Sequence, residues 1–214
     1  MLNEKQRESI PETEIIEVNL EDYLETYAER GYEWVDGKAI KLAPIGLRHE
    51  KIRDYLKDLL RIYFISNPIG IVLAEPFMML MPKVPNRRRE PDLMIVLNSN
   101  PNELKETYMD GPADICIEIV SQGSVSVDHG AKFEEYAKGG VREYWIIDPI
   151  RNECRFYQLD KDGVYQPQAK DGTVYQTSQL PNLVIDTDVL WKDELPNVIE
   201  VVEIVKDMLN EKDK

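Results

Sequence analysis

The sequence contains little cysteine and no long apolar run, and each shortage removes a class of protein from consideration. Its 214 residues include two cysteines, Cys116 and Cys154, and two cysteines cannot form a structural zinc site by themselves. Both lie in apolar, strand-like stretches, which predicts buried thiols rather than a disulfide. No run of about 18 apolar residues is available to span a bilayer. Because the N-terminus also has no apolar stretch typical of a signal peptide, we expect a cytoplasmic protein.

Positive charge is also scarce. The chain has 26 Lys and Arg against 40 Asp and Glu, a net charge of -14. Such a field repels phosphate and argues against non-specific binding of nucleic acid. The only basic run is Arg87, Arg88 and Arg89. A solvated loop is its simplest interpretation, but in so acidic a chain these arginines are the obvious candidates to contact phosphate.

The remaining composition is that of an ordinary soluble protein, with 43% hydrophobic and 31% charged residues. The length is enough for one domain, or for one domain with an appendage. We expect a flexible N-terminus at residues 1–17, a domain at 18–192, and a C-terminal helix or tail at 193–214.

Apolar spacing predicts the order of helices and strands. Helices are expected at 20–28, 47–64, 129–138 and 198–209, and strands at 32–41 (a hairpin around Asp36-Gly37), 69–73 paired with 77–81, 92–97, 115–120, 143–148, and a meander of 153–159, 163–166 and 173–176. This order of helix, several strands, helix and further strands indicates an α/β domain built on a mixed sheet.

Three residues in this pattern point to chemistry. Asp92 lies at the start of an apolar strand, Glu118 lies inside a second strand, and Lys132 lies in the first turns of the helix that follows. A buried carboxylate is costly unless it meets a cation or hydrogen-bond donors. Two strand carboxylates and one lysine are what a magnesium-dependent phosphodiesterase needs, because they offer oxygen ligands and a positive charge beside the phosphate.

Each of these residues also has a simpler interpretation. Glu118 could form an internal salt bridge with Lys132, and Lys132 could form an exposed ion pair with Asp128, four residues earlier. Asp92 follows a proline, as is common in turns. His49, at the start of the long helix, is more simply a surface or core residue than a catalytic one.

Several segments resemble a known family, the Uma-type putative restriction endonucleases of the PD-(D/E)XK nuclease superfamily. The matching segments are Tyr32-Glu-Trp-Val-Asp-Gly, Glu90-Pro-Asp-Leu-Met-Ile-Val, Ile117-Glu-Ile-Val-Ser, and Lys132 with Tyr136 through Gly140-Val-Arg-Glu-Tyr-Trp-Ile-Ile-Asp-Pro149. The resemblance implies a restriction-endonuclease-like αβββαβ core with an extra N-terminal hairpin and a C-terminal β-meander. It also implies Asp92 and Glu118 as the acidic pair, with Lys132 as the lysine.

The sequence departs from the superfamily motif at one position. Val120 stands two residues after Glu118, where the motif has its lysine, and Lys132 on the following helix can fill the same space. His49 matches a position where the family often has histidine. The resemblance thus implies four catalytic candidates: Asp92, Glu118, Lys132 and His49.

We therefore expect a metal-dependent DNA endonuclease. Asp92, Glu118 and the main-chain carbonyl of Ile119 would hold Mg²⁺, with Mn²⁺ as a substitute, and Lys132 would orient or deprotonate the attacking water. Because one chain offers a single candidate site, we expect a homodimer. The alternatives are an inactive nuclease-fold protein that binds nucleic acid or a protein, and a toxin-antitoxin-like interaction protein.

Overall fold

The fold is built around a six-stranded mixed sheet. A computed structural model describes residues 14–28, 30–42, 44–121, 123–125 and 127–210. The strands of this central sheet are β4 (Gly70–Ala74), β7 (Leu93–Leu97), β10 (Ile115–Ile119), β11 (Glu143–Asp148), β12 (Glu153–Leu159) and β13 (Tyr165–Pro167). They lie in the order β13-β12-β11-β10-β7-β4, and only β10 and β11 pair in parallel.

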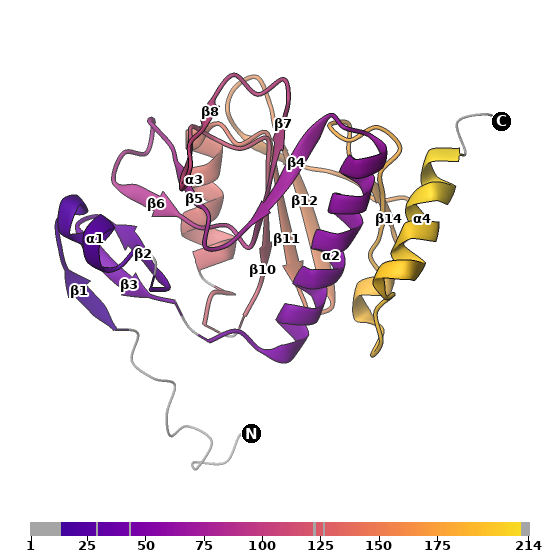
Figure 1. Cartoon of the computed structure of the whole chain (residues 1–214), viewed down its shortest axis with the longest axis horizontal. Helices are drawn as coiled ribbons and strands as arrows, with labels where there is room; N and C mark the ends of the chain where they lie inside the picture. Colours follow the sequence, from indigo (N-terminus) through magenta and orange to yellow (C-terminus); the bar gives the residue numbers. More distant parts are fainter. Residues whose placement is uncertain (1–13, 29, 43, 122, 126, 211–214) are drawn as a thin grey trace, which may run out of the picture.

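Helices cover both faces of the central sheet. Helices α2 (Leu47–Ser66) and α4 (Val198–Asn210) lie on one side, and α3 (Lys132–Gly139) lies on the other (Figure 1). When the strands of the second sheet are set aside, the chain order from α2 to β11 is α2-β4-β7-β10-α3-β11, or αβββαβ, so the predicted fold class and core are confirmed. None of the helices within the described residues combines the length and apolar content that crossing a bilayer requires.

The long helix forms where its apolar spacing predicts. Its buried face includes Ile52, Leu56 and Leu60, none of which is exposed, and they pack against one face of the central sheet. Helix α4 packs beside α2 and places Val201 and Val205 in the same core. Burial of these apolar faces, rather than helix propensity alone, stabilises both helices.

A second, seven-stranded sheet lies beside α3. Its strands are β1 (Ile15–Glu17), β2 (Tyr32–Val35), β3 (Lys38–Lys41), β5 (Met78–Leu80), β6 (Arg87–Arg89), β8 (Glu103–Leu104) and β9 (Tyr108–Asp110), in the order β1-β3-β2-β6-β5-β9-β8. The predicted hairpin joins β2 to β3, and Asp36 (φ 50°) and Gly37 (φ 78°) adopt the left-handed backbone of a type I′ turn. The short helix α1 (Leu20–Thr26) packs its Tyr23 beside Trp34.

The structure describes the expected flexible N-terminus, residues 1–17, only from residue 14 on. Residues 1–13 of the expected flexible N-terminus lie outside the described residues. Ile15–Glu17 form β1, which pairs with β3 in antiparallel register. This part of the predicted flexible segment therefore belongs to the second sheet.

Three predicted pairings or boundaries differ from the structure. Strands β4 and β5 do not pair with each other, because β4 pairs with β7 in the central sheet while β5 pairs with β6 and β9 in the second. The last strand of the expected meander, β14 (Val174–Gln176), pairs instead with β15 (Val184–Asp186). The helix predicted from residue 129 begins as a π-helical turn, Val127–Ala131, that leads into α3.

Candidate active site

The two strand carboxylates lie on the same side of the central sheet. Strands β7 and β10 pair in antiparallel register with Leu93 opposite Ile117, so the next pair outward is Asp92 opposite Glu118. Side chains directly opposite each other in such a pair share one face. Glu118 faces Lys132 and Tyr136 of α3, and both carboxylates are buried, with exposed fractions of 7% for Asp92 and 2% for Glu118.

Helix α3 supplies the partners of Glu118. Lys132 Nζ lies 2.8 Å from Glu118 Oε2, and the Tyr136 hydroxyl donates to Glu118 Oε1 at 2.6 Å. Lys132 and Tyr136 are four residues apart and share one face of the helix, as their spacing predicts. Burial raises the pKa of Glu118 to about 8 although Lys132 opposes the shift, and Asp92 and Asp128 add to it.

Lys132 is surrounded by carboxylates from three elements. Besides Glu118, its ammonium lies 3.3 Å from Asp128 Oδ1 in the π-helical turn and 3.9 Å from Glu33 Oε1 on β2. Burial alone would lower the pKa of Lys132, but these carboxylates outweigh burial and hold it well above its usual value. The lysine is therefore a fixed, buried cation, and its pair with Asp128 is not the exposed ion pair of the simpler interpretation.

His49 supports the other carboxylate. Asp92 Oδ2 accepts a hydrogen bond from the backbone N–H of Ile119 at 2.6 Å and lies 3.2 Å from His49 Nε2. His49 comes from the first turn of α2 and is 4% exposed. Burial opposes its protonation, but the hydrogen bond to Asp92 and the charge of Asp92 outweigh burial and raise the pKa of His49. The imidazole holds Asp92 in place from the opposite layer.

The arginine run is a strand and not a solvated loop. Arg89 on β6 is 3% exposed, and its guanidinium donates to Glu33 at 2.5 Å and to Glu135 at 2.8 Å. Arg87 pairs with Glu135 at 2.6 Å and also with Asp36. The structure thus places two of the three predicted phosphate contacts in internal ion pairs.

The third arginine occupies a different environment. Arg88 stacks its guanidinium over Trp34, 5.6 Å from the ring centroid, and has no carboxylate partner among the described residues. Burial lowers the pKa of Arg88 from its ordinary value. Of the run, Arg88 is therefore the member whose charge is not already neutralised.

The sequence did not single out Glu33 as part of this site. Glu33 accepts from Arg89 and also lies near Lys132, so it links the arginine strand to the lysine. It comes from the N-terminal hairpin, and no local spacing connects it with Lys132. Asp128 had a signal in its four-residue spacing from Lys132, but the spacing alone did not distinguish a buried pair from an exposed one.

The carboxylate oxygens of this site are ligands of the kind that a hard cation prefers. Asp92 and Glu118 provide carboxylate oxygens, which Mg²⁺ prefers, and Mg²⁺ usually keeps several water ligands. Asp92 Oδ1 accepts no hydrogen bond from any described residue. Within the same part of the chain, no group of three or more His, Cys, Asp or Glu side chains is arranged to hold a metal ion. Water and a main-chain carbonyl would therefore have to complete the coordination.

Comparison with known proteins identifies the family. The model of the Uma2 family, described as "Putative restriction endonuclease", matches residues 20–188. The chain belongs to the Uma2 family. A crystal structure of a putative nuclease belonging to DUF820 from Anabaena variabilis has the same fold, with a TM-score of 0.67 and 18% sequence identity over 81% of this chain and 97% of that one. No curated protein matches this Uma2 chain.

Proposed function

We propose that this Uma2 protein is a metal-dependent endonuclease that hydrolyses DNA phosphodiester bonds. One juxtaposition carries the proposal: Asp92 and Glu118 share one face of the central sheet, and Lys132 Nζ lies 2.8 Å from Glu118 Oε2. A carboxylate pair with an adjacent fixed cation can serve both a metal ion and the phosphate that is attacked. The family description and the nuclease fold of the Anabaena variabilis protein agree with this chemistry.

Asp92 and Glu118, with the main-chain carbonyl of Ile119, would hold the Mg²⁺ ion. The surroundings favour a cation, because burial and the nearby charge of Asp92 raise the pKa of both Glu118 and Asp128 despite Lys132. When bound, Mg²⁺ supplies an activated water and neutralises charge on the phosphate. His49 and the backbone N–H of Ile119 keep Asp92 aimed at this position.

Lys132 would act through its charge. Because its pKa is held well above the usual value, it remains protonated and does not take a proton from the attacking water. Its ammonium instead stabilises the negative charge that grows on the phosphate oxygens. Asp128 and Glu33, at 3.3 Å and 3.9 Å from Lys132 Nζ, would still hold the lysine in place if Glu118 served as a metal ligand.

One observation favours the alternative of a nuclease-fold protein that does not cut. Both oxygens of Glu118 already have partners, Lys132 and Tyr136. If these contacts persist in solution, Glu118 is a structural ion pair and offers less to a metal ion. A nucleic acid or a protein would then be bound without hydrolysis.

The deciding experiment combines DNA cleavage with metal binding. Supercoiled plasmid is incubated with Mg²⁺, Mn²⁺ or EDTA, and Ca²⁺ binding is followed by calorimetry. We expect nicking only with Mg²⁺ or Mn²⁺, and a loss of about 10²-fold or more in Glu118→Gln. Glu134→Gln, an exposed position on the same helix, is the matched control and should cut normally. If the wild-type protein neither cuts DNA nor binds divalent ions, the proposal is wrong and the alternative, a nuclease-fold protein that does not cut, takes its place.

A further inference from the structure

A third carboxylate continues the acidic pair of the candidate active site. Strands β4 and β7 pair in antiparallel register with Ala74 opposite Leu93, so the next pair outward is Glu75 opposite Asp92. The backbone N–H of Glu75 donates to the carbonyl of Asp92 at 3.4 Å, which extends this register one residue beyond β4. Since Asp92 also lies opposite Glu118, three adjacent strands each lead to one acidic residue at the same level. We call Glu75, Asp92 and Glu118 the carboxylate row.

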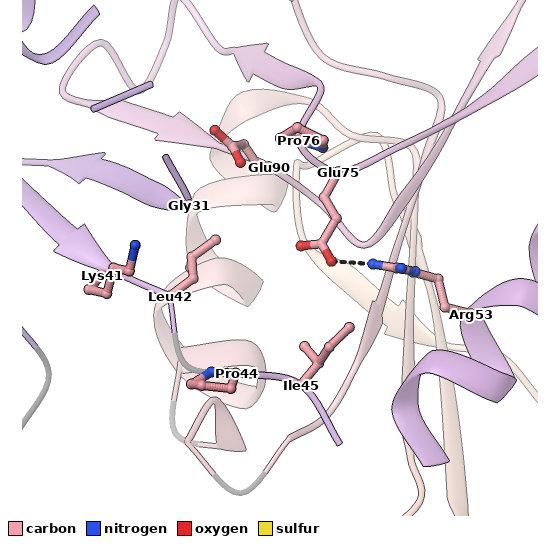
Figure 2. A pocket seen from close by; sticks show the side chains of 9 residues that line it. All are labelled: Gly31, Lys41, Leu42, Pro44, Ile45, Arg53, Glu75, Pro76 and Glu90. Atoms are coloured by element: carbon pink, nitrogen blue, oxygen red, sulfur yellow. Dashed lines mark hydrogen bonds and ion pairs between the residues drawn. The ribbon is translucent and has the colours of Figure 1, made fainter. Parts of the chain in front are cut away.

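Glu75 is the accessible member of the carboxylate row. Its side chain keeps an exposed fraction of 21%, against 10% for Asp92 and 3% for Glu118. It lines a pocket of about 470 Å³ beside the candidate active site, and Figure 2 shows its carboxylate pointing into this pocket. Water can therefore reach the row from the side of Glu75.

One oxygen of Glu75 is free to accept a hydrogen bond. Oε1 forms an ion pair with Arg53, whereas Oε2 accepts from no described residue and is not enclosed. Asp92 is divided in the same way, because its Oδ2 contacts His49 and the backbone N–H of Ile119 while its Oδ1 has no partner among the described residues. Two neighbouring members of the row thus each present one free oxygen.

The charges of the site also act on Glu75. Burial and the charge of Asp92 raise the pKa of Glu75. The cations Arg53, His49 and Lys132 act in the opposite direction. Because the interaction of two charges weakens with their separation, Glu75 belongs to the electrostatic environment of the candidate active site and not only to the pocket.

The spacing of the strands indicates how Glu75 would serve a cation. Neighbouring strands lie roughly 4.8 Å apart, so Glu75 and Glu118 are separated by about 10 Å along the sheet. Within the described residues, no three acidic, His or Cys side chains are arranged to hold an ion directly. Mg²⁺ usually keeps several water ligands, however, and those waters need hydrogen-bond acceptors. The free oxygen of Glu75 is such an acceptor.

We propose that Glu75 is a positioning residue of the cation site, whose Oε2 accepts a hydrogen bond from a water ligand of the ion held by Asp92 and Glu118. This inference rests on the metal site of the proposed function. Lys132 cannot do the same, because an ammonium group has no acceptor. The ion pair with Arg53 fixes the Glu75 carboxylate, so the water would be held in one orientation.

Mn²⁺ without DNA is the probe, and the electron paramagnetic resonance signal of the free ion measures its binding. Contacts beyond the direct ligands typically change metal affinity by roughly 10–100-fold. The Kd of Glu75→Leu for Mn²⁺ should therefore be about 10-fold or more above that of the wild type. Arg53 keeps Glu50, whose two oxygens each accept from it at 2.6 Å, so the variant should fold, which thermal melting without metal checks.

Glu50→Leu is the matched control. It removes an equal charge beside Arg53 but lies outside the carboxylate row, so it should bind Mn²⁺ nearly as tightly as the wild type. Glu75→Gln keeps an acceptor oxygen without the charge and should bind with an affinity between those of the wild type and Glu75→Leu. Its result decides if the leucine variant does not fold. Wild-type affinity in the Glu75 variants, or an equal loss in Glu50→Leu, would overturn the proposal.

The two proposals fail separately. If Glu75→Leu loses affinity for Mn²⁺ but the wild type never cuts plasmid, the endonuclease is wrong and the role of Glu75 stands. If the wild type cuts plasmid and both proteins bind Mn²⁺ equally, the endonuclease stands and the role of Glu75 is wrong. A wild type that binds no Mn²⁺ contradicts both.

Discussion

Replacement of Lys132 by methionine is the most informative single perturbation of this site. Methionine keeps the unbranched apolar stem and removes the charge that lies 2.8 Å from Glu118 and 3.3 Å from Asp128. Both carboxylates are almost fully buried, with exposed fractions of 2% and 1%. The variant therefore leaves buried negative charge without its cation.

The expected loss of stability follows from this geometry. Breaking a buried ion pair by removing one partner costs about 3–5 kcal/mol. For a domain of this size, each kcal/mol lowers the melting temperature by roughly 2–4 °C, so Lys132→Met should melt about 6–20 °C lower than the wild type. Lys138→Met, an exposed position on the same helix, should melt within a few degrees of the wild type.

Divalent ions separate a metal site from a purely structural ion pair. If Asp92 and Glu118 hold a cation, millimolar Mg²⁺ should raise the melting temperature of Lys132→Met by more than that of the wild type, because the ion replaces the lost positive charge. Plasmid cleavage, measured below the melting temperature of the variant, should still fall by about 10²-fold or more. A variant that melts like the wild type would refute the buried-pair reasoning, and one that cuts normally would refute the catalytic role of Lys132.

Three further outcomes are expected. Arg88→Ala should weaken DNA binding and reduce its dependence on salt concentration, because Arg88 is the one arginine of its run without a carboxylate partner among the described residues. An unchanged dependence on salt would show that Arg88 does not contact phosphate. Burial, Glu33 and Glu75 raise the pKa of Glu90 to about 8 although Lys132 opposes the shift, so the folded state binds this proton more tightly than the unfolded state does. The free energy of unfolding of the wild type should therefore fall relative to that of Glu90→Gln as the pH rises from about 4.5 to 8. Parallel urea titrations that keep a constant difference over this range would contradict the assignment. Light scattering should report a homodimer, and a monomer at high micromolar concentration counts against one.

Local sequence was sufficient for the long helix, for the hairpin and for part of the site. The apolar spacing of residues 47–64 predicted the long helix, and Asp36-Gly37 predicted the hairpin, because helix faces and tight turns depend on neighbours a few residues away. Strand alternation placed Glu118 in a buried position, and burial follows from that position alone. The place of Lys132 beside Glu118 was implied by the family resemblance, since local spacing also allowed an exposed pair with Asp128.

Tertiary structure alone decided which distant elements meet. The pairing of β4 with β7 rather than β5 depends on which sheet each strand joins, and that choice is made by packing across the whole domain. The sequence predicts that the arginine run is a solvated loop, but the fold brings Glu33 and Glu135 to Arg89 from two other elements. Such contacts leave no periodic trace in the chain, since a charge is neutralised by whatever the fold places beside it, at any separation in sequence.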